Sequence, residues 1–76
     1  MSTTNTLLDL AAKQFSADRE TLSAEQDIFD ALGIDSLKAL ELLSEVELEF
    51  DVEIPDYELQ DVKTFAQLAE KIEERR

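Results

Sequence analysis

The stretch SLKALELLSEVELEF, residues 36–50, decides the fold class. Its apolar residues recur every three or four positions, which is the spacing of one face of an α-helix. That stripe comprises Ala39, Leu42, Leu43, Val46 and Phe50. From Val46 to Ile54, apolar and acidic residues alternate as they do in a half-buried strand. No other segment offers a strand partner, and a lone strand is unstable. We therefore predict a helix that continues to Phe50 or Asp51.

Two further segments show helical spacing. A first helix is predicted from about Thr4 to Phe15, and a last helix begins after Thr64, whose hydroxyl suits an N-cap. Their apolar faces are Leu7, Leu8, Ala11, Ala12 and Phe15 in the first helix, and Phe65, Leu68, Ala69 and Ile72 in the last. Pro55 interrupts the chain before the last helix, and Asp56 is predicted to cap a short helix that runs through Val62.

Residues 16–35 allow two interpretations. Ser23 followed by Gln26 is typical of a capping box, which would open a helix that ends at Gly33. The same residues also suit a long loop with one helical turn, held to the core by Phe29 and Leu32. Three aspartates interrupt the segment and favour the loop, namely Asp18, Asp27 and Asp30. We predict an all-α protein, a small four-helix bundle of three longer helices and one short one, with a long loop after the first helix. Residues 1–76 are expected to form a single domain.

The composition excludes several classes of protein. The 76 residues include 19 acidic and seven basic side chains, for a net charge of −12, with no Cys and no His. A disulfide framework, a thiolate zinc site and a Cys–His or Ser–His catalytic pair are all excluded. No apolar run approaches the roughly 18 residues that span a bilayer. So acidic a chain also repels nucleic acid and anionic membranes. We expect a cytoplasmic monomer.

The negative charge concentrates on the second helix and the segment after it. Residues 36–62 hold nine acids and one base, whereas residues 63–76 carry a net charge of +1. Leu37, Leu40 and Leu48 follow a ridge that is rotated away from the apolar stripe and flanked by carboxylates. A charged face is often only a solvated face that keeps a protein monomeric. Leucines among the acids favour a docking face for a basic partner.

Ser36 is the residue of chemical interest. Serine is a common helix N-cap, because its oxygen accepts a hydrogen bond from a free backbone N–H. Asp35 offers the same cap one residue earlier, and would then leave the Ser36 hydroxyl free after Gly33. A helix N-terminus favours an attached phosphate. Ser36 has no local base, so it is not a self-activated nucleophile, but another enzyme can modify it.

Two motifs carry a resemblance to a known family. The run LGIDSL at residues 32–37, followed by EFDVEIPD at residues 49–56 in a small acidic chain, resembles the acyl carrier proteins. The resemblance covers nearly the whole chain. It implies that Ser36 carries 4'-phosphopantetheine, installed from coenzyme A by a phosphopantetheinyl transferase (holo-ACP synthase), and that acyl groups are held on this arm as thioesters. The protein would then shuttle them between enzymes of fatty-acid, polyketide or related acyl biosynthesis without being an enzyme itself.

The resemblance also assigns roles to the surface and the core. Docking to basic patches on transferring, ligating and condensing enzymes is expected at Asp35, Leu37, Leu40, Glu41, Glu45, Glu47, Leu48, Ile54 and Asp56. An acyl pocket is expected among the core residues Ala39, Leu42, Val46, Phe50, Leu59, Val62, Leu68 and Ile72. No metal site is expected. The residues Lys38, Ser44, Leu48 and Gln60 depart from the family's usual pattern and suggest a dedicated pathway. The alternative is a small acidic helical adaptor that binds a basic partner, with Ser36 only an N-cap.

Overall fold

The computed structural model describes residues 2–75, apart from the side chain of Asp56. The first helix, α1 (Thr3–Gln14), begins at a cap in which the Ser2 hydroxyl accepts a hydrogen bond from the Asn5 N–H at 3.0 Å. Its buried face contains the predicted residues Leu7, Leu8, Ala11 and Ala12. The helical spacing of the apolar residues therefore placed α1 to within one residue at each end.

The central helix, α3 (Ser36–Phe50), follows the predicted stripe. Ala39, Leu42, Leu43 and Val46 are buried, and Phe50 is half-buried and packs against the core. The helix ends because Asp51 adopts a left-handed conformation with φ of 55°. No strand forms among residues 2–75, so the alternation from Val46 to Ile54 marks the end of a helix and a loop.

The long segment between α1 and α3 is a loop with one short helix, α2 (Ile28–Leu32), and one 3₁₀ turn, η1 (Arg19–Thr21). The Gln26 side chain does accept a hydrogen bond from the Ser23 N–H at 2.8 Å, but no helix begins there. Asp27 caps α2 instead, accepting from the N–H groups of the second and third helical residues. The loop interpretation is confirmed. Ile28 and Leu32 hold the loop to the core, whereas Phe29 does not belong to the core cluster.

The segment after Pro55 forms a 3₁₀ helix, η2 (Asp56–Asp61). A short helix thus forms where the sequence predicted one, ending one residue before Val62. Pro55 occupies its N-cap position and Asp56 is its first residue, so the prediction that Asp56 caps it was wrong. The last helix, α4 (Phe65–Arg75), has the predicted cap at Thr64. The Thr64 hydroxyl accepts from the Gln67 N–H at 3.2 Å, and the Gln67 side chain accepts from the Thr64 N–H at 3.1 Å. This reciprocal pair is a capping box.

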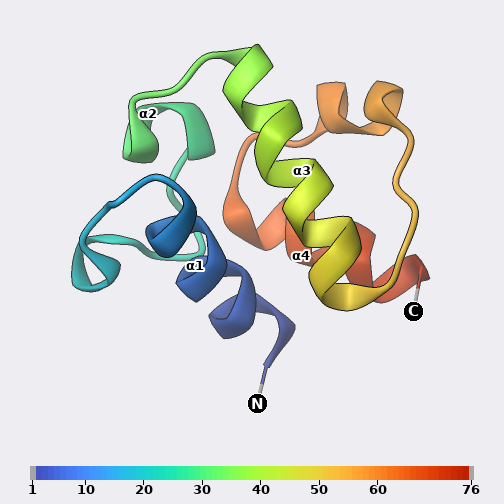
Figure 1. Cartoon of the computed structure of the whole chain (residues 1–76), viewed down its shortest axis with the longest axis horizontal. Helices are drawn as coiled ribbons and strands as arrows, with labels where there is room; N and C mark the ends of the chain where they lie inside the picture. The colour runs from blue at the N-terminus through green and yellow to red at the C-terminus, as the bar shows by residue number, and fades with distance from the viewer. Residues whose placement is uncertain (1, 76) are drawn as a thin grey trace.

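The helices pack into a small bundle in which α1 lies against α4 and α3 (Figure 1). Two backbone hydrogen bonds tie the long loop to the start of α4. The Ile28 N–H donates to the Lys63 carbonyl at 2.7 Å, and the Ala66 N–H donates to the Ala24 carbonyl at 2.8 Å. Four α-helices and no strand are present in the described residues, which confirms the predicted all-α bundle. None of these helices is long and apolar enough to cross a membrane.

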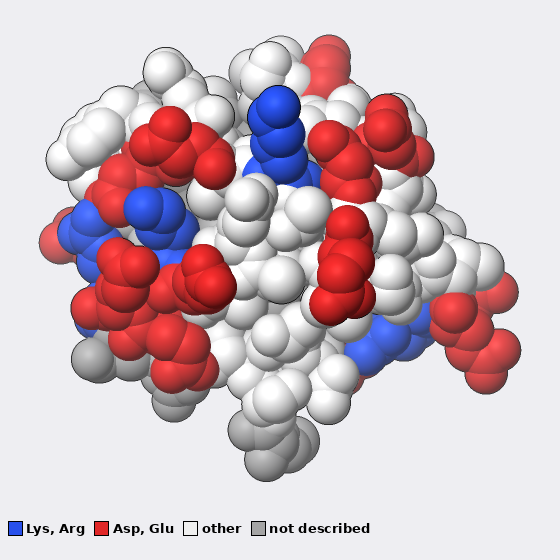
Figure 2. Space-filling model, turned by 180° about the vertical axis from the view of Figure 1, so that it is seen from behind, with Lys and Arg blue, Asp and Glu red and all other residues white. Residues whose placement is uncertain are grey.

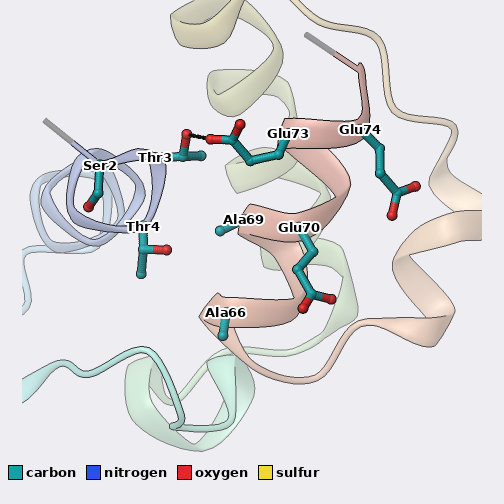
Figure 3. Close-up of a pocket in the computed structure, with 8 residues that line it drawn as sticks. All are labelled: Ser2, Thr3, Thr4, Ala66, Ala69, Glu70, Glu73 and Glu74. Carbon is teal, nitrogen blue, oxygen red and sulfur yellow. Dashed lines mark hydrogen bonds between the residues drawn. The ribbon is translucent and has the colours of Figure 1, made fainter.

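The acidic side chains are not confined to α3. Figure 2 shows the molecule from behind, and carboxylates gather toward both sides of this face around an uncharged middle. Elsewhere, residues of α1 and α4 line an open groove of about 650 Å³ (Figure 3). The Thr3 hydroxyl crosses it to donate a hydrogen bond to the Glu73 carboxylate. Ser36 does not line this groove.

Candidate functional site at the start of α3

Ser36 is the first residue of α3, and its hydroxyl does not cap the helix. The N-cap is Asp35, whose Oδ1 accepts a hydrogen bond from the Lys38 N–H at 3.0 Å. Ser36 is exposed, and its hydroxyl makes no hydrogen bond to any described residue. Of the two readings of this serine, the structure selects the one in which Asp35 is the cap. The adaptor hypothesis assigned Ser36 a capping role, and that assignment was wrong.

The turn before Ser36 depends on Gly33. This residue ends α2 in the left-handed region, with φ of 64°, which side chains other than glycine adopt only at a cost. The Ile34 N–H then donates to the Phe29 carbonyl at 3.1 Å, and the Ile34 side chain packs against the core. A β-carbon on Gly33 would touch nothing within 4 Å, so the backbone alone requires the glycine. This turn therefore fixes the positions of Asp35 and Ser36 at the surface.

A groove of about 360 Å³ opens beside Ser36. Its walls come from α2, from the first turns of α3 and from the segment around η2. Besides Ser36, the lining residues are Phe29, Leu40, Tyr57, Leu59, Gln60, Val62 and Lys63. Val62 is buried and Phe29 and Leu59 are half-buried, whereas Tyr57, Gln60 and Lys63 are exposed. The groove thus has an apolar floor and a polar rim.

The exposed ridge on α3 is where the sequence placed it. Leu37 and Leu48 are 69% and 78% exposed, and Leu40 is 38% exposed. Glu41 is exposed and Glu45 half-buried on the same helix. The Lys38 ammonium lies 3.4 Å from the Glu41 carboxylate, so the one base of α3 is already paired. Exposed leucines and the acidic side chains of Glu41 and Glu45 therefore share one face of α3 next to Ser36, and the nearby Lys38 charge is paired with Glu41.

Comparisons with known proteins agree with this geometry. A family model described as "Phosphopantetheine attachment site" matches residues 5–72. The chain belongs to the acyl carrier protein family. It is 37% identical over 67 residues to an acyl carrier protein of Bdellovibrio bacteriovorus, covering 88% of this chain and 86% of that protein. It is 40% identical over 58 residues to one of Syntrophobacter fumaroxidans (76% and 72%), and 45% identical over 56 residues to one of aster yellows witches'-broom phytoplasma (74% and 74%).

The cofactor of an acyl carrier protein is covalently attached 4'-phosphopantetheine. The residues at the start of α3 fit that group. A phosphodiester needs an accessible hydroxyl, and Ser36 is exposed and free of other hydrogen bonds within the described part of the chain. The N-terminus of α3 supplies the positive end of a helix dipole for the attached phosphate. No metal is needed to complete this fit, and no group of three or more metal-ligating side chains comes together among residues 2–75.

The structure removes Ile54 from the predicted docking face and gives Glu47 a structural role as well. Ile54 is only 3% exposed, so its assignment to a partner surface was wrong. Its backbone is extended ahead of Pro55, and its side chain turns into the core. Glu47 is half-buried and accepts a hydrogen bond from the Ile54 N–H at 2.9 Å, so it also holds the loop after α3. The prediction for Asp56 lies outside the described side chains.

The predicted acyl pocket coincides with the groove only at Leu59 and Val62. The other six residues are buried in the core or pack against it, namely Ala39, Leu42, Val46, Phe50, Leu68 and Ile72. Sequence reasoning assigned no pocket role to the polar rim or to Phe29. One signal pointed to the rim, since Lys63 is a lone base directly after a segment with nine acids. The spacing along a helix does not show which loop residues meet that helix.

Proposed function

We propose that this protein holds acyl groups as thioesters on a 4'-phosphopantetheine arm attached to Ser36 and passes them between biosynthetic enzymes. The observation that carries the proposal is that two different residues at the start of α3 provide the helix cap and the free hydroxyl. Asp35 caps the helix, and the next residue presents a free hydroxyl to solvent. The arm supplies the thiol that a chain without cysteine lacks. Fatty-acid, polyketide or related acyl biosynthesis is the proposed setting.

The local electrostatics suit a phosphodiester at Ser36. The first backbone N–H groups of a helix have no partner within the helix and carry partial positive charge. The Asp35 carboxylate satisfies one of them, the Lys38 N–H. The other free N–H groups at this end of α3 would favour a phosphate attached to Ser36. The described residues place no base at hydrogen-bonding distance from the Ser36 hydroxyl, so the chain contributes the position of the serine and the electrostatic field of the helix end, and the transferase supplies the chemistry.

The α3 ridge is the proposed docking face. Leu37, Leu40 and Leu48 offer apolar anchors, and Glu41 and Glu45 offer negative charge to basic patches on the phosphopantetheinyl transferase and on acyl-transferring, ligating and condensing enzymes. Exposed charge speeds encounter more than it strengthens the complex. Fast, salt-sensitive contacts suit a monomeric carrier that visits several enzymes in turn.

These roles need neither catalysis nor a second domain. We propose that residues 1–76 act as one carrier domain in the cytoplasm, with all bond-making chemistry supplied by the partner enzymes. The family match over residues 5–72 supports a carrier role, because it spans α1 through most of α4. The core that holds α3 in place draws on every α-helix, so the docking face and Ser36 belong to one folded unit.

A thiol titration tests this function. The chain is treated with coenzyme A, magnesium and a broad-specificity phosphopantetheinyl transferase and then purified away from all three. Because it has no cysteine, any thiol on the purified chain belongs to the arm. One thiol per chain is expected, and none after Ser36→Ala. Ser44→Ala is the matched control, since Ser44 is another exposed serine on α3 whose hydroxyl donates to the Leu40 carbonyl at 3.3 Å. A thiol that persists after Ser36→Ala would refute the assignment.

A further inference from the structure

The groove beside Ser36 combines an apolar floor with a basic residue at its rim. Val62 is 3% exposed and Tyr57 67% exposed, so the groove is lined by both core and surface side chains. Its volume of about 360 Å³ corresponds to about a dozen non-hydrogen atoms, taking the ~30 Å³ that one water occupies in the liquid. A group of that size is a short chain with room for a polar end.

Lys63 is unusual among the cations of this acidic chain. Arg19, Lys38, Lys71 and Arg75 each pair with a carboxylate. Lys13 and Lys63 are the basic side chains without such a pair in the part of the chain that the structure describes. Of these two, Lys63 lines the groove that contains Ser36. Its positive charge is therefore available to a group held at that serine.

The backbone at Lys63 is held firmly. Its N–H donates to the Gln67 side chain at 2.7 Å, and its carbonyl accepts from the Ile28 N–H at 2.7 Å. One bond reaches α4 and the other reaches the start of α2, so the residue is fixed between two elements of the bundle. A positive charge on a fixed backbone discriminates between charged and neutral ligands better than a charge on a loose loop.

We propose that this groove selects a short acyl group that ends in a carboxylate, with Lys63 as the residue that recognises the charge. The methylene stem lies on the floor formed by Phe29, Leu59 and Val62, and the carboxylate reaches the rim. The proposal rests on the proposed function, because it requires a cargo attached through Ser36, which lines this groove. It adds a substrate class, an acyl group with a terminal carboxylate, and one specificity-determining residue.

Two cargoes of equal chain length test the selection. The protein is loaded from glutaryl-coenzyme A or from pentanoyl-coenzyme A by a broad-specificity transferase, so that the cargoes differ only in a terminal carboxylate or methyl group. Lys63→Gln removes the charge, and Lys13→Gln is the matched control on α1. The readouts are the amide NMR shifts of Gln60 and Lys63 and the rate of thioester hydrolysis. Comparing variants with the same cargo cancels the cargo's own reactivity.

The expected result is specific to one cargo and one lysine. The glutaryl thioester should hydrolyse at least about two-fold more slowly in the parent protein than in Lys63→Gln, as one exposed ion pair allows. The pentanoyl thioester should show the same rate in both, and Lys13→Gln should match the parent. Glutaryl loading should also shift the Gln60 and Lys63 amide signals further than pentanoyl loading does.

Three outcomes would overturn the selection. Equal glutaryl hydrolysis rates in the parent and Lys63→Gln would show that the lysine does not hold the cargo. The arm-bearing protein with a free thiol carries no cargo. If it already showed the Gln60 and Lys63 amide shifts expected for glutaryl loading, Lys63 would be binding the arm's phosphodiester instead. Both results leave the carrier function standing. Failure of the transferase to load either cargo would refute the carrier function and this inference with it.

Discussion

The Oδ1 atom of Asp35 accepts a hydrogen bond from the backbone N–H of Lys38 at 3.0 Å, and this bond closes the first turn of α3 over Ser36. Because Asp35 satisfies the helix end, the serine beside it contributes nothing to the cap. Asp35 thus stabilises the start of the helix, and the adjacent Ser36 is available for the proposed modification. A serine with no structural role is free to carry a group without weakening the helix that presents it.

Substitution of these neighbours separates the two roles. Asp35→Ala should lower the free energy of unfolding by about 1 kcal/mol, as the loss of an N-cap does. Ser36→Ala should change it by less than about 0.5 kcal/mol, as for an exposed residue without partners. Urea unfolding followed by circular dichroism measures both. A larger loss for Ser36→Ala than for Asp35→Ala would show that the serine is the cap after all.

Gly33 should resist replacement for reasons of backbone conformation alone. Its φ of 64° is strained for a residue with a side chain, and a new β-carbon meets no atom within 4 Å. Gly33→Ala is therefore expected to cost about 1–2 kcal/mol of unfolding free energy. Gly33→Asn should cost less, since asparagine tolerates the left-handed region. Thermal unfolding of the two variants gives the order, and equal losses would point to a steric cause instead.

Glu58 links η2 to α4. Its carboxylate lies 3.6 Å from the Lys71 ammonium and also pairs with Arg75, and its side chain is only 13% exposed. Glu58→Gln should lower the unfolding free energy by about 1–3 kcal/mol, because two cations lose a largely buried partner. Glu41→Gln is the control, since its exposed pair with Lys38 is expected to contribute less than about 0.5 kcal/mol. Similar losses in urea unfolding for both variants would contradict the structural role of Glu58.

The rate at which the transferase modifies the protein should depend on the charges of the docking face. Replacing Glu41 and Glu45 by lysine should slow modification by the transferase about ten-fold or more at low salt, and the difference should shrink as salt is added. The double variant Glu70→Lys with Glu74→Lys changes the net charge equally but lies on α4. It should slow the reaction far less. Equal slowing in both variants would mean that total charge matters and the α3 face does not.

Periodicity predicted the helices well and the segments between them poorly. Ala39, Leu42 and Val46 repeat at helical spacing and are buried, because one helix face meets the core along its whole length. Ile54 follows the same acidic run but sits before Pro55, where extended backbone turns its side chain inward. The family resemblance placed Ile54 on the docking face, but the local backbone turns it into the core.

The chemical centre was more predictable than the groove beside it. Asp35 and Ser36 are adjacent in the chain, so the question of which one caps the helix is visible in the sequence itself. The groove instead joins Phe29 from α2, Leu40 from α3 and Lys63 from the segment before α4. Residues brought together by packing of three separate elements leave no spacing signal along the chain. Their meeting follows from loop paths, such as the Ile28 N–H bond to the Lys63 carbonyl.

The central claim is that Ser36 carries the arm, and intact mass spectrometry tests it most directly. The purified chain is incubated with coenzyme A, magnesium and a broad-specificity phosphopantetheinyl transferase. We expect a mass gain of one phosphopantetheine unit in the parent and in Ser44→Ala, and no gain in Ser36→Ala that circular dichroism shows to be folded. No gain in the folded parent, or an undiminished gain in Ser36→Ala, would contradict the account.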